Sequence, residues 1–115
     1  MYWRTEEENT IAVLFRFSKK EPDALLSFIY SDDEEYVFLF HSACEGDNQD
    51  DVDAGISAEL EDFFVIGYHV IEVTKAGPHG FQTGEYIDVD YRDMPLRIIT
   101  DDGVIIYPAS LRKHD

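Results

Sequence analysis

The chain has 115 residues and a net charge of −16, from 25 acidic and 9 basic side chains. This length fits a single domain, residues 1–115, and a hydrophobic content of 44% excludes a chain that is disordered throughout. The negative charge repels nucleic acids, phosphate ligands and anionic membranes, and it attracts cations and basic proteins.

The first half of the chain predicts a strand, a helix and a second strand. Residues 10–17, TIAVLFRF, are rich in β-branched and aromatic side chains, which is typical of a central strand. Residues 21–30, EPDALLSFIY, predict a short helix, because Pro22 suits a first helical position and the leucines follow helical spacing. Residues 35–42, EYVFLFHS, predict the second strand, and the acidic loop of residues 45–53 follows it.

Residues 56–64 fit two interpretations. Their apolar positions repeat with the spacing of an amphipathic helix. A strand rich in Val and Ile is predicted directly after them, at residues 65–74, and it could begin earlier. The choice between helix and strand for residues 56–64 therefore stays open.

Three further strands are predicted after a glycine-rich loop at residues 75–84. Residues 85–92 alternate, with Ile87, Val89 and Tyr91 on one face and Tyr86, Asp88, Asp90 and Arg92 on the other. Residues 95–100 and 104–108 flank a hairpin turn in which Gly103 supplies a positive φ. The order β-α-β-α-β-β-β-β predicts an α+β fold, with a mostly antiparallel β-sheet and about two helices packed on one face.

The acidic segment CEGDNQDDVDAG, residues 44–55, raises the question of a metal site. The window that starts at Asp51 has Gly55 and Ile56 where an EF-hand loop needs an oxygen ligand and a glycine. His41 and Cys44 form one pair with zinc-like spacing, but a zinc site needs a second pair. The sequence therefore predicts no metal and no cofactor, although cation binding by residues 45–53 stays open.

Motifs for catalysis are lacking as well. Cys44 lies among carboxylates, whereas reactive cysteines prefer an electropositive setting. The glycine loop at residues 77–84 lacks the Lys-Ser/Thr pair of a phosphate cradle, and no nucleophile elbow is present. The sequence therefore predicts a protein that is not an enzyme.

Acidic groups at defined places suggest a protein-binding face. No Lys or Arg occurs between Lys20 and Lys75, and Asp32–Glu35 follow the end of the predicted helix, where negative charge opposes the macrodipole. Aromatic side chains adjoin the acidic groups, which is usual in protein-binding patches. The predicted partner-binding residues are Asp32, Asp33, Glu34, Glu35, Asp88 and Asp90, with Tyr36 and Tyr86 as anchors.

Cysteine content and the N-terminal sequence predict a soluble, cytoplasmic protein. A single cysteine permits no internal disulfide. The first ten residues, MYWRTEEENT, contain neither the basic region nor the apolar region of a signal peptide. No apolar run reaches the ~18 residues of a membrane span. The chain is expected to contact neither membranes nor nucleic acid directly, and its oligomeric state stays open.

In size and acidity the chain resembles small bacterial immunity proteins and nucleic-acid mimics, without a sequence motif of either group. The resemblance implies a non-enzymatic immunity or inhibitor protein that neutralises a basic, nuclease-like toxin. Its carboxylates would then occupy the positions of substrate phosphates, and opposite charge would speed encounter. The alternatives are a nucleic-acid mimic that blocks DNA-binding proteins, and an acidic structural or regulatory domain.

Overall fold

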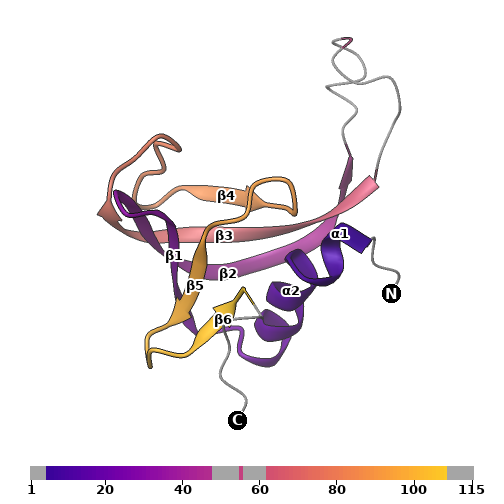
Figure 1. Ribbon diagram of the computed structural model, residues 1–115, viewed down its shortest axis with the longest axis horizontal. Coiled ribbons are helices and arrows are strands. Elements are labelled where there is room, and N and C mark those ends of the chain that lie inside the picture. The colour runs from indigo at the N-terminus through magenta and orange to yellow at the C-terminus, as the bar shows by residue number, and fades with distance from the viewer. Residues whose placement is uncertain (1–4, 48–54, 56–61, 109–115) are drawn as a thin grey trace.

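The described residues form one antiparallel sheet that carries a helix on one of its faces (Figure 1). The computed structural model describes residues 5–47, 55 and 62–108. The elements in chain order are the single turn α1 (Thr5–Glu8), the helix α2 (Ile11–Lys20) and the strands β1 (Leu25–Ser31), β2 (Glu34–Asp47), β3 (Asp62–Lys75), β4 (Tyr86–Val89), β5 (Arg97–Thr100) and β6 (Ile105–Tyr107).

The strands follow the spatial order β4-β3-β2-β1-β5-β6, and every neighbouring pair is antiparallel. β2 and β3 have 14 residues each, and they pair from Glu35 and Lys75 to Asp47 and Asp62. Three register shifts interrupt this pairing, and such bulges bend a strand and increase its twist. The long β2–β3 ribbon is therefore curved, as Figure 1 shows.

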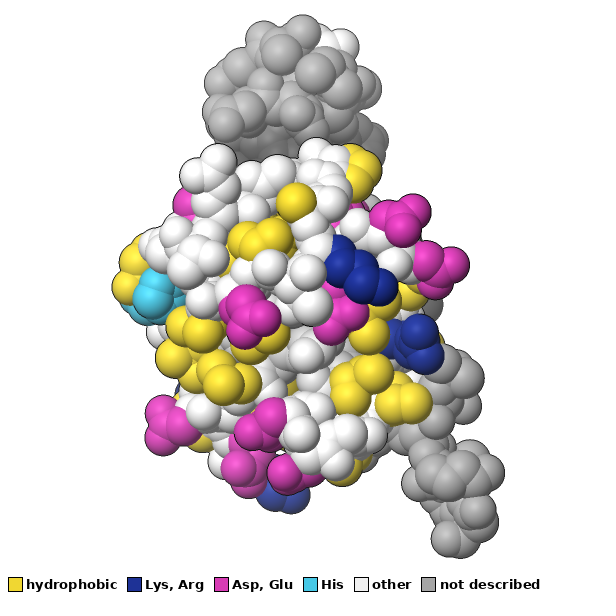
Figure 2. Space-filling view, turned by 90° about the vertical axis from the view of Figure 1, so that its left-hand side faces the viewer, with side chains coloured by type: hydrophobic (Ala, Val, Ile, Leu, Met, Phe, Trp, Pro, Cys, Tyr) yellow, Lys and Arg dark blue, Asp and Glu magenta, His cyan; other side chains and the backbone are white. Residues whose placement is uncertain are grey.

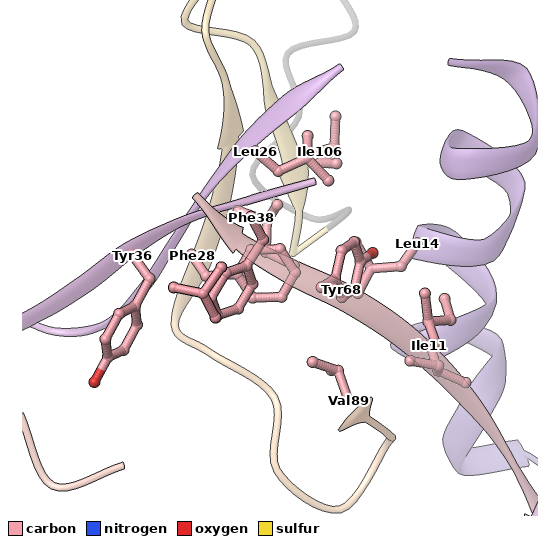
Figure 3. Close-up of a cluster of buried hydrophobic side chains, with 12 residues drawn as sticks. Ile11, Leu14, Leu26, Phe28, Tyr36, Phe38, Tyr68, Val89 and Ile106 are labelled. Atoms are coloured by element: carbon pink, nitrogen blue, oxygen red, sulfur yellow. The ribbon is translucent and has the colours of Figure 1, made fainter. Parts of the chain in front are cut away.

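The core lies between α2 and the sheet face that α2 covers. Ile11 and Leu14 of α2 are fully buried, and Leu14 reaches toward the ring of Tyr68 in Figure 3. The ring centroid of Phe28 lies 4.5 Å from that of Phe38 and 5.1 Å from that of Tyr68. Because aromatic rings bury large areas, this cluster is the centre of the core.

The segment predicted as the first strand is the helix α2. Its residues are rich in β-branched and aromatic side chains, but they also place Ile11, Leu14 and Ser18 on one helical face, and all three are buried. Lys19 and Lys20 occupy the last turn, where positive charge complements the helix dipole. The prediction was wrong because β-branched content was weighted above this longer helical period.

The segment predicted as the first helix is mostly the strand β1. Leu26 and Phe28 are buried on the core side, whereas Leu25 is 37% exposed on the other side. This alternation is the period of a strand, and the helical spacing of the leucines was coincidental. The described chain thus has one helix of 10 residues, preceded by the single turn α1, where about two helices were predicted.

The later elements agree with the sequence. β2 contains residues 35–42 and continues into the acidic segment as far as Asp47, and β3 contains residues 65–74. The alternating segment supplies β4, and the turn between β5 and β6 has Gly103 at φ 88°. Residues 48–53 of the acidic loop, residue 54 and residues 56–61 lie outside the described residues, while residues 62–64 belong to β3. No described helix has the length and apolar character needed to cross a membrane.

The packing of α2 gives a first test of this fold. Leu14→Ala should lower the free energy of unfolding by about 2–5 kcal/mol, because it opens a cavity against the buried aromatic cluster. The exposed Lys20→Ala serves as the control and should stay within about 0.5 kcal/mol of the parent. Urea denaturation followed by circular dichroism measures both. Equal stability of the two variants would contradict the docking of α2.

Candidate functional site

A buried carboxylate at the start of β2 organises the most extensive polar network among the described residues. Glu34 is only 2% exposed. Its Oε2 accepts hydrogen bonds from the hydroxyl of Tyr36 at 2.6 Å and from the backbone N–H of His79 at 2.8 Å. A buried carboxylate needs such donors, because leaving it without them would cost several kcal/mol.

The imidazole of His79 joins this carboxylate to a second one. Its Nδ1 lies 2.9 Å from Oε1 of Glu34, and its Nε2 lies 2.7 Å from Oδ2 of Asp93. An ionised carboxylate acts only as an acceptor, and both ring nitrogens donate when the ring is an imidazolium, so the two carboxylates and a protonated His79 match as acceptors and donors. The ring centroids of Tyr30 and Phe81 lie 4.1 and 5.1 Å away, which fixes the imidazole between aromatic side chains.

The pKa values in this network follow from burial and hydrogen bonding. Burial opposes ionisation of Glu34, but hydrogen bonds from Tyr36 and His79 outweigh it and lower the pKa of the carboxyl group. Burial likewise opposes the charge of His79, but its hydrogen bonds to Glu34 and Asp93 raise the pKa of the imidazole. The network is therefore a negative–positive–negative triad at mildly acidic pH.

The triad connects three segments that are distant in the sequence. Glu34 begins β2, His79 belongs to the loop between β3 and β4, and Asp93 belongs to the loop between β4 and β5. Gly77 lets the first loop approach, since a Cβ there would lie 2.5 Å from Cγ of Glu34. We infer that the hydrogen bonds of the triad hold both loops against the β1–β2 turn.

The face of the sheet that points away from α2 and the core carries a row of aromatic and aliphatic side chains. The register aligns Leu25, Leu39, His69 and Tyr86 across four strands. These residues point away from the core, and Tyr86 is 61% exposed. Its ring stacks on His69 at 4.5 Å and meets the ring of His41 edge-on at 4.8 Å. We call this side of the sheet the outer face.

The predicted binding residues separate into exposed and buried ones. Asp32 and Asp33 are exposed in the β1–β2 turn, Glu35 is half-buried, and Asp88 is exposed on β4. Within the described part of the chain, none of these four carboxylates forms a salt bridge. Asp90 follows β4 and forms a two-pronged ion pair with Arg92, with contacts of 2.9 and 3.0 Å.

Glu34 and Tyr36 require a correction. Tyr36 is 0% exposed and Glu34 is 2% exposed, so neither is available to a partner in this structure. The strand period explains this, because residues 34, 36 and 38 of β2 share the core side while Glu35 faces out. This alternation was already visible in the sequence, and the acidic run obscured it.

The predicted acidic residues lie far apart along the sheet. Asp88 pairs with Gly67, whereas Asp32 lies beside Lys75, whose Nζ donates to the Asp32 carbonyl at 3.0 Å. Gly67 and Lys75 are eight residues apart on β3, which is roughly 26 Å at the usual strand rise. Any partner that contacts both acidic groups must therefore cover much of the sheet.

Sequence reasoning missed His79 and Asp93 as members of a site. Their spacing carries no motif, and only the folded loops bring them to Glu34. No group of three or more His, Cys, Asp or Glu side chains in the described residues is arranged to hold a metal ion. A hollow of about 240 Å³ lies between α2 and β6, away from the triad, lined by Val13, Arg16, Phe17, Lys20 and Ile106.

Comparison with known protein families, with curated proteins and with solved structures finds no match to this chain.

The triad predicts how stability depends on pH. The contribution of His79 is fully present below its ordinary pKa of 6.5 and is lost as pH rises through its raised value. The contribution of Glu34 is present above its ordinary 4.5 and is lost as pH falls through its lowered value. The melting temperature of the parent should therefore exceed that of His79→Gln most between pH 4.5 and 6.5.

Thermal melts of both proteins across pH 3 to 10, about the accessible range, measure this difference. Self-repulsion among the other acids affects both proteins alike, so the difference isolates the triad. A difference that stays constant with pH would show that His79 contributes packing but no charge.

Proposed function

We propose that the chain is a non-enzymatic binding protein whose acidic outer face engages a basic protein. The observation that carries this proposal is the outer face, which no described helix covers, and where exposed Tyr86 and half-buried aliphatic side chains lie beside carboxylates without salt-bridge partners among the described residues. Exposed aromatic side chains with a polar rim are the usual composition of a protein interface.

The surface chemistry supports this choice of partner. Figure 2 shows hydrophobic side chains exposed between scattered carboxylates, with few Lys or Arg side chains in view. Lys75 and Arg97 lie near the acidic turn and partly offset the negative charge of Asp32 and Asp33 there, whereas Asp88 has no salt-bridge partner among the described residues. A net charge of −16 also directs a basic protein toward this chain over long range at low salt.

In its most specific form, the proposal is an immunity or inhibitor protein that covers the basic active site of a nuclease-like toxin. Carboxylates would replace substrate phosphates there, and charge would speed the encounter. A nucleic-acid mimic that blocks DNA-binding proteins uses the same chemistry on many partners. The number of proteins captured by the immobilised chain distinguishes the two, because an inhibitor retains one cognate partner.

Association kinetics test the proposed face. Asp32→Asn combined with Asp33→Asn should slow association with the captured basic protein by about threefold to tenfold at low salt, and added salt should reduce the difference. The matched control is Asp101→Asn combined with Asp102→Asn, which removes two carboxylates from the β5–β6 turn. Surface plasmon resonance at low salt and at about 0.5 M salt measures the rates.

Two results would contradict the proposal. Equal association rates for both double variants would show that only net charge matters, so that the acids keep the protein in solution without forming a binding face. Association that does not change with salt would show that the partner does not recognise negative charge at all.

A further inference from the structure

The centre of the outer face is apolar, although the solvated face of an antiparallel sheet usually carries polar side chains. The outward-pointing side chains there come from β1, β2 and β5, and they are Leu25, Ser27, Ile29, Val37, Leu39 and Ile99. Leu25 is 37% exposed and the others are half-buried. Only Ser27 among them is polar. We call the five aliphatic side chains of this set the aliphatic patch.

The register places the aliphatic patch in one continuous area. Ser27 lies between Val37 of β2 and Ile99 of β5, and Leu25 lies opposite Leu39. Side chains that face each other across neighbouring strands are in contact range. The described helices lie on the other side of the sheet, where α2 contacts β3 and β6 (Figure 1). No described helix therefore covers the patch.

The dimensions of the aliphatic patch match those of an α-helix. β2, β1 and β5 are neighbours in the sheet, so the patch is roughly 10 Å wide at the usual strand spacing. From Leu25 to Ile29 it extends roughly 13 Å along β1. A helix with its side chains is about 10 Å in diameter and rises about 5.4 Å per turn. A helix of about two to three turns is therefore sufficient to cover the patch.

The edges of the sheet favour this mode of binding over strand addition. The edge strand β4 has four residues and the edge strand β6 has three. An added strand binds mainly through backbone hydrogen bonds, and such short edges offer few of them. The face of the sheet thus offers a partner more contact area than either edge.

Charge identifies the kind of helix that fits. Glu72 lies opposite Val37, and Asp88 follows the exposed Tyr86 by two residues on β4. Both carboxylates are exposed, and neither forms a salt bridge among the described residues. A second copy of this chain also carries a charge of −16, so like charges oppose its approach. A basic helix meets attraction at the same carboxylates.

We propose that the aliphatic patch binds a basic amphipathic helix of the partner. The apolar stripe of that helix covers the patch, with anchors at i, i+3, i+4 and i+7. Its Lys and Arg side chains extend from both sides of the stripe toward Glu72 and Asp88. Long basic side chains also cover apolar surface with their methylene groups. This inference rests on the proposed function and specifies the structural element that the partner presents.

The first experiment uses a defined peptide and the full chain. The capped peptide is about 14 residues long, roughly 21 Å as a helix, with leucines at helical spacing and lysines elsewhere. A scrambled peptide of the same composition, without the helical spacing, is the matched control. Titration of isotopically labelled protein should place the largest NMR amide shifts on Ser27, Val37 and Ile99. Circular dichroism should show that the peptide gains helix on binding, and the scrambled peptide should bind at least about tenfold more weakly.

Variants with unchanged charge then test the aliphatic patch. Val37→Thr combined with Ile99→Thr keeps β-branched side chains in both strands but removes apolar surface, so binding should weaken by about tenfold. Val65→Thr is the control, because Val65 lies opposite Cys44 on the same face, beyond the patch. It should bind like the parent. Isothermal titration calorimetry measures all affinities, and thermal melts confirm that each variant is folded.

A second pair of variants adds the same charge at two places. Ser27→Lys introduces a positive charge at the centre of the aliphatic patch and should abolish binding of the peptide. Gln82→Lys adds this charge to the exposed loop between β3 and β4 and should reduce the affinity only slightly. Equal effects of the two changes would contradict docking on the patch.

The remaining outcomes separate this inference from the wider proposal. Equal affinity for the scrambled peptide would show that charge alone is recognised, so the acidic binding protein would stand without a helix-binding patch. Unchanged affinity in the threonine double variant would show that the aliphatic side chains serve only the strands themselves. A parent that sediments as a dimer, with the double variant a monomer, would assign the patch to a second copy. If neither peptide binds, the inference is wrong, and the association kinetics with the captured partner decide the wider proposal separately.

Discussion

The arrangement of the loops depends on a carboxylate that is buried in an acidic protein. Self-repulsion disfavours placing another negative charge inside a chain of this composition, and Glu34 is nevertheless 2% exposed. It stays ionised because Tyr36 and His79 donate hydrogen bonds to it, and His79 also brings a positive charge. Two loops are held to the β1–β2 turn by this arrangement, since His79 and Asp93 belong to different loops.

The sequence predicted the second half of the fold better than the first. Local sequence patterns determine the strands and the hairpin turn of the second half. These patterns are the alternation in residues 85–92, the turn glycine Gly103 and the Val-rich sequence of β3. Residues 10–17 and 21–30 are short apolar runs that fit both periods, and contacts with distant strands decide between them. Residues 11–20 form a helix because the face that contains Leu14 and Ser18 packs against β3 and β6, and the local sequence does not show this packing.

The binding residues could be predicted only in part. Asp32, Asp33 and Asp88 are exposed as expected, because turns and outer strand faces place charges in solvent. Glu34 and Tyr36 could have been excluded by the strand period of β2. The roles of His79 and Asp93 follow from contacts between loops and β2, and their spacing in the sequence does not indicate these contacts.

The contact between α2 and β6 has a consequence for how the chain folds. α2 lies near the N-terminus, and the strand it contacts ends at Tyr107. β5 joins the sheet through β1, with Leu26 opposite Thr100, roughly 70 residues away. During synthesis the β1–β2 hairpin can form early, but α2 cannot reach its full packing until β6 has left the ribosome. The part of the apolar stripe of α2 that faces β6 therefore stays uncovered until β6 has been synthesised, and apolar surface exposed at that stage promotes aggregation.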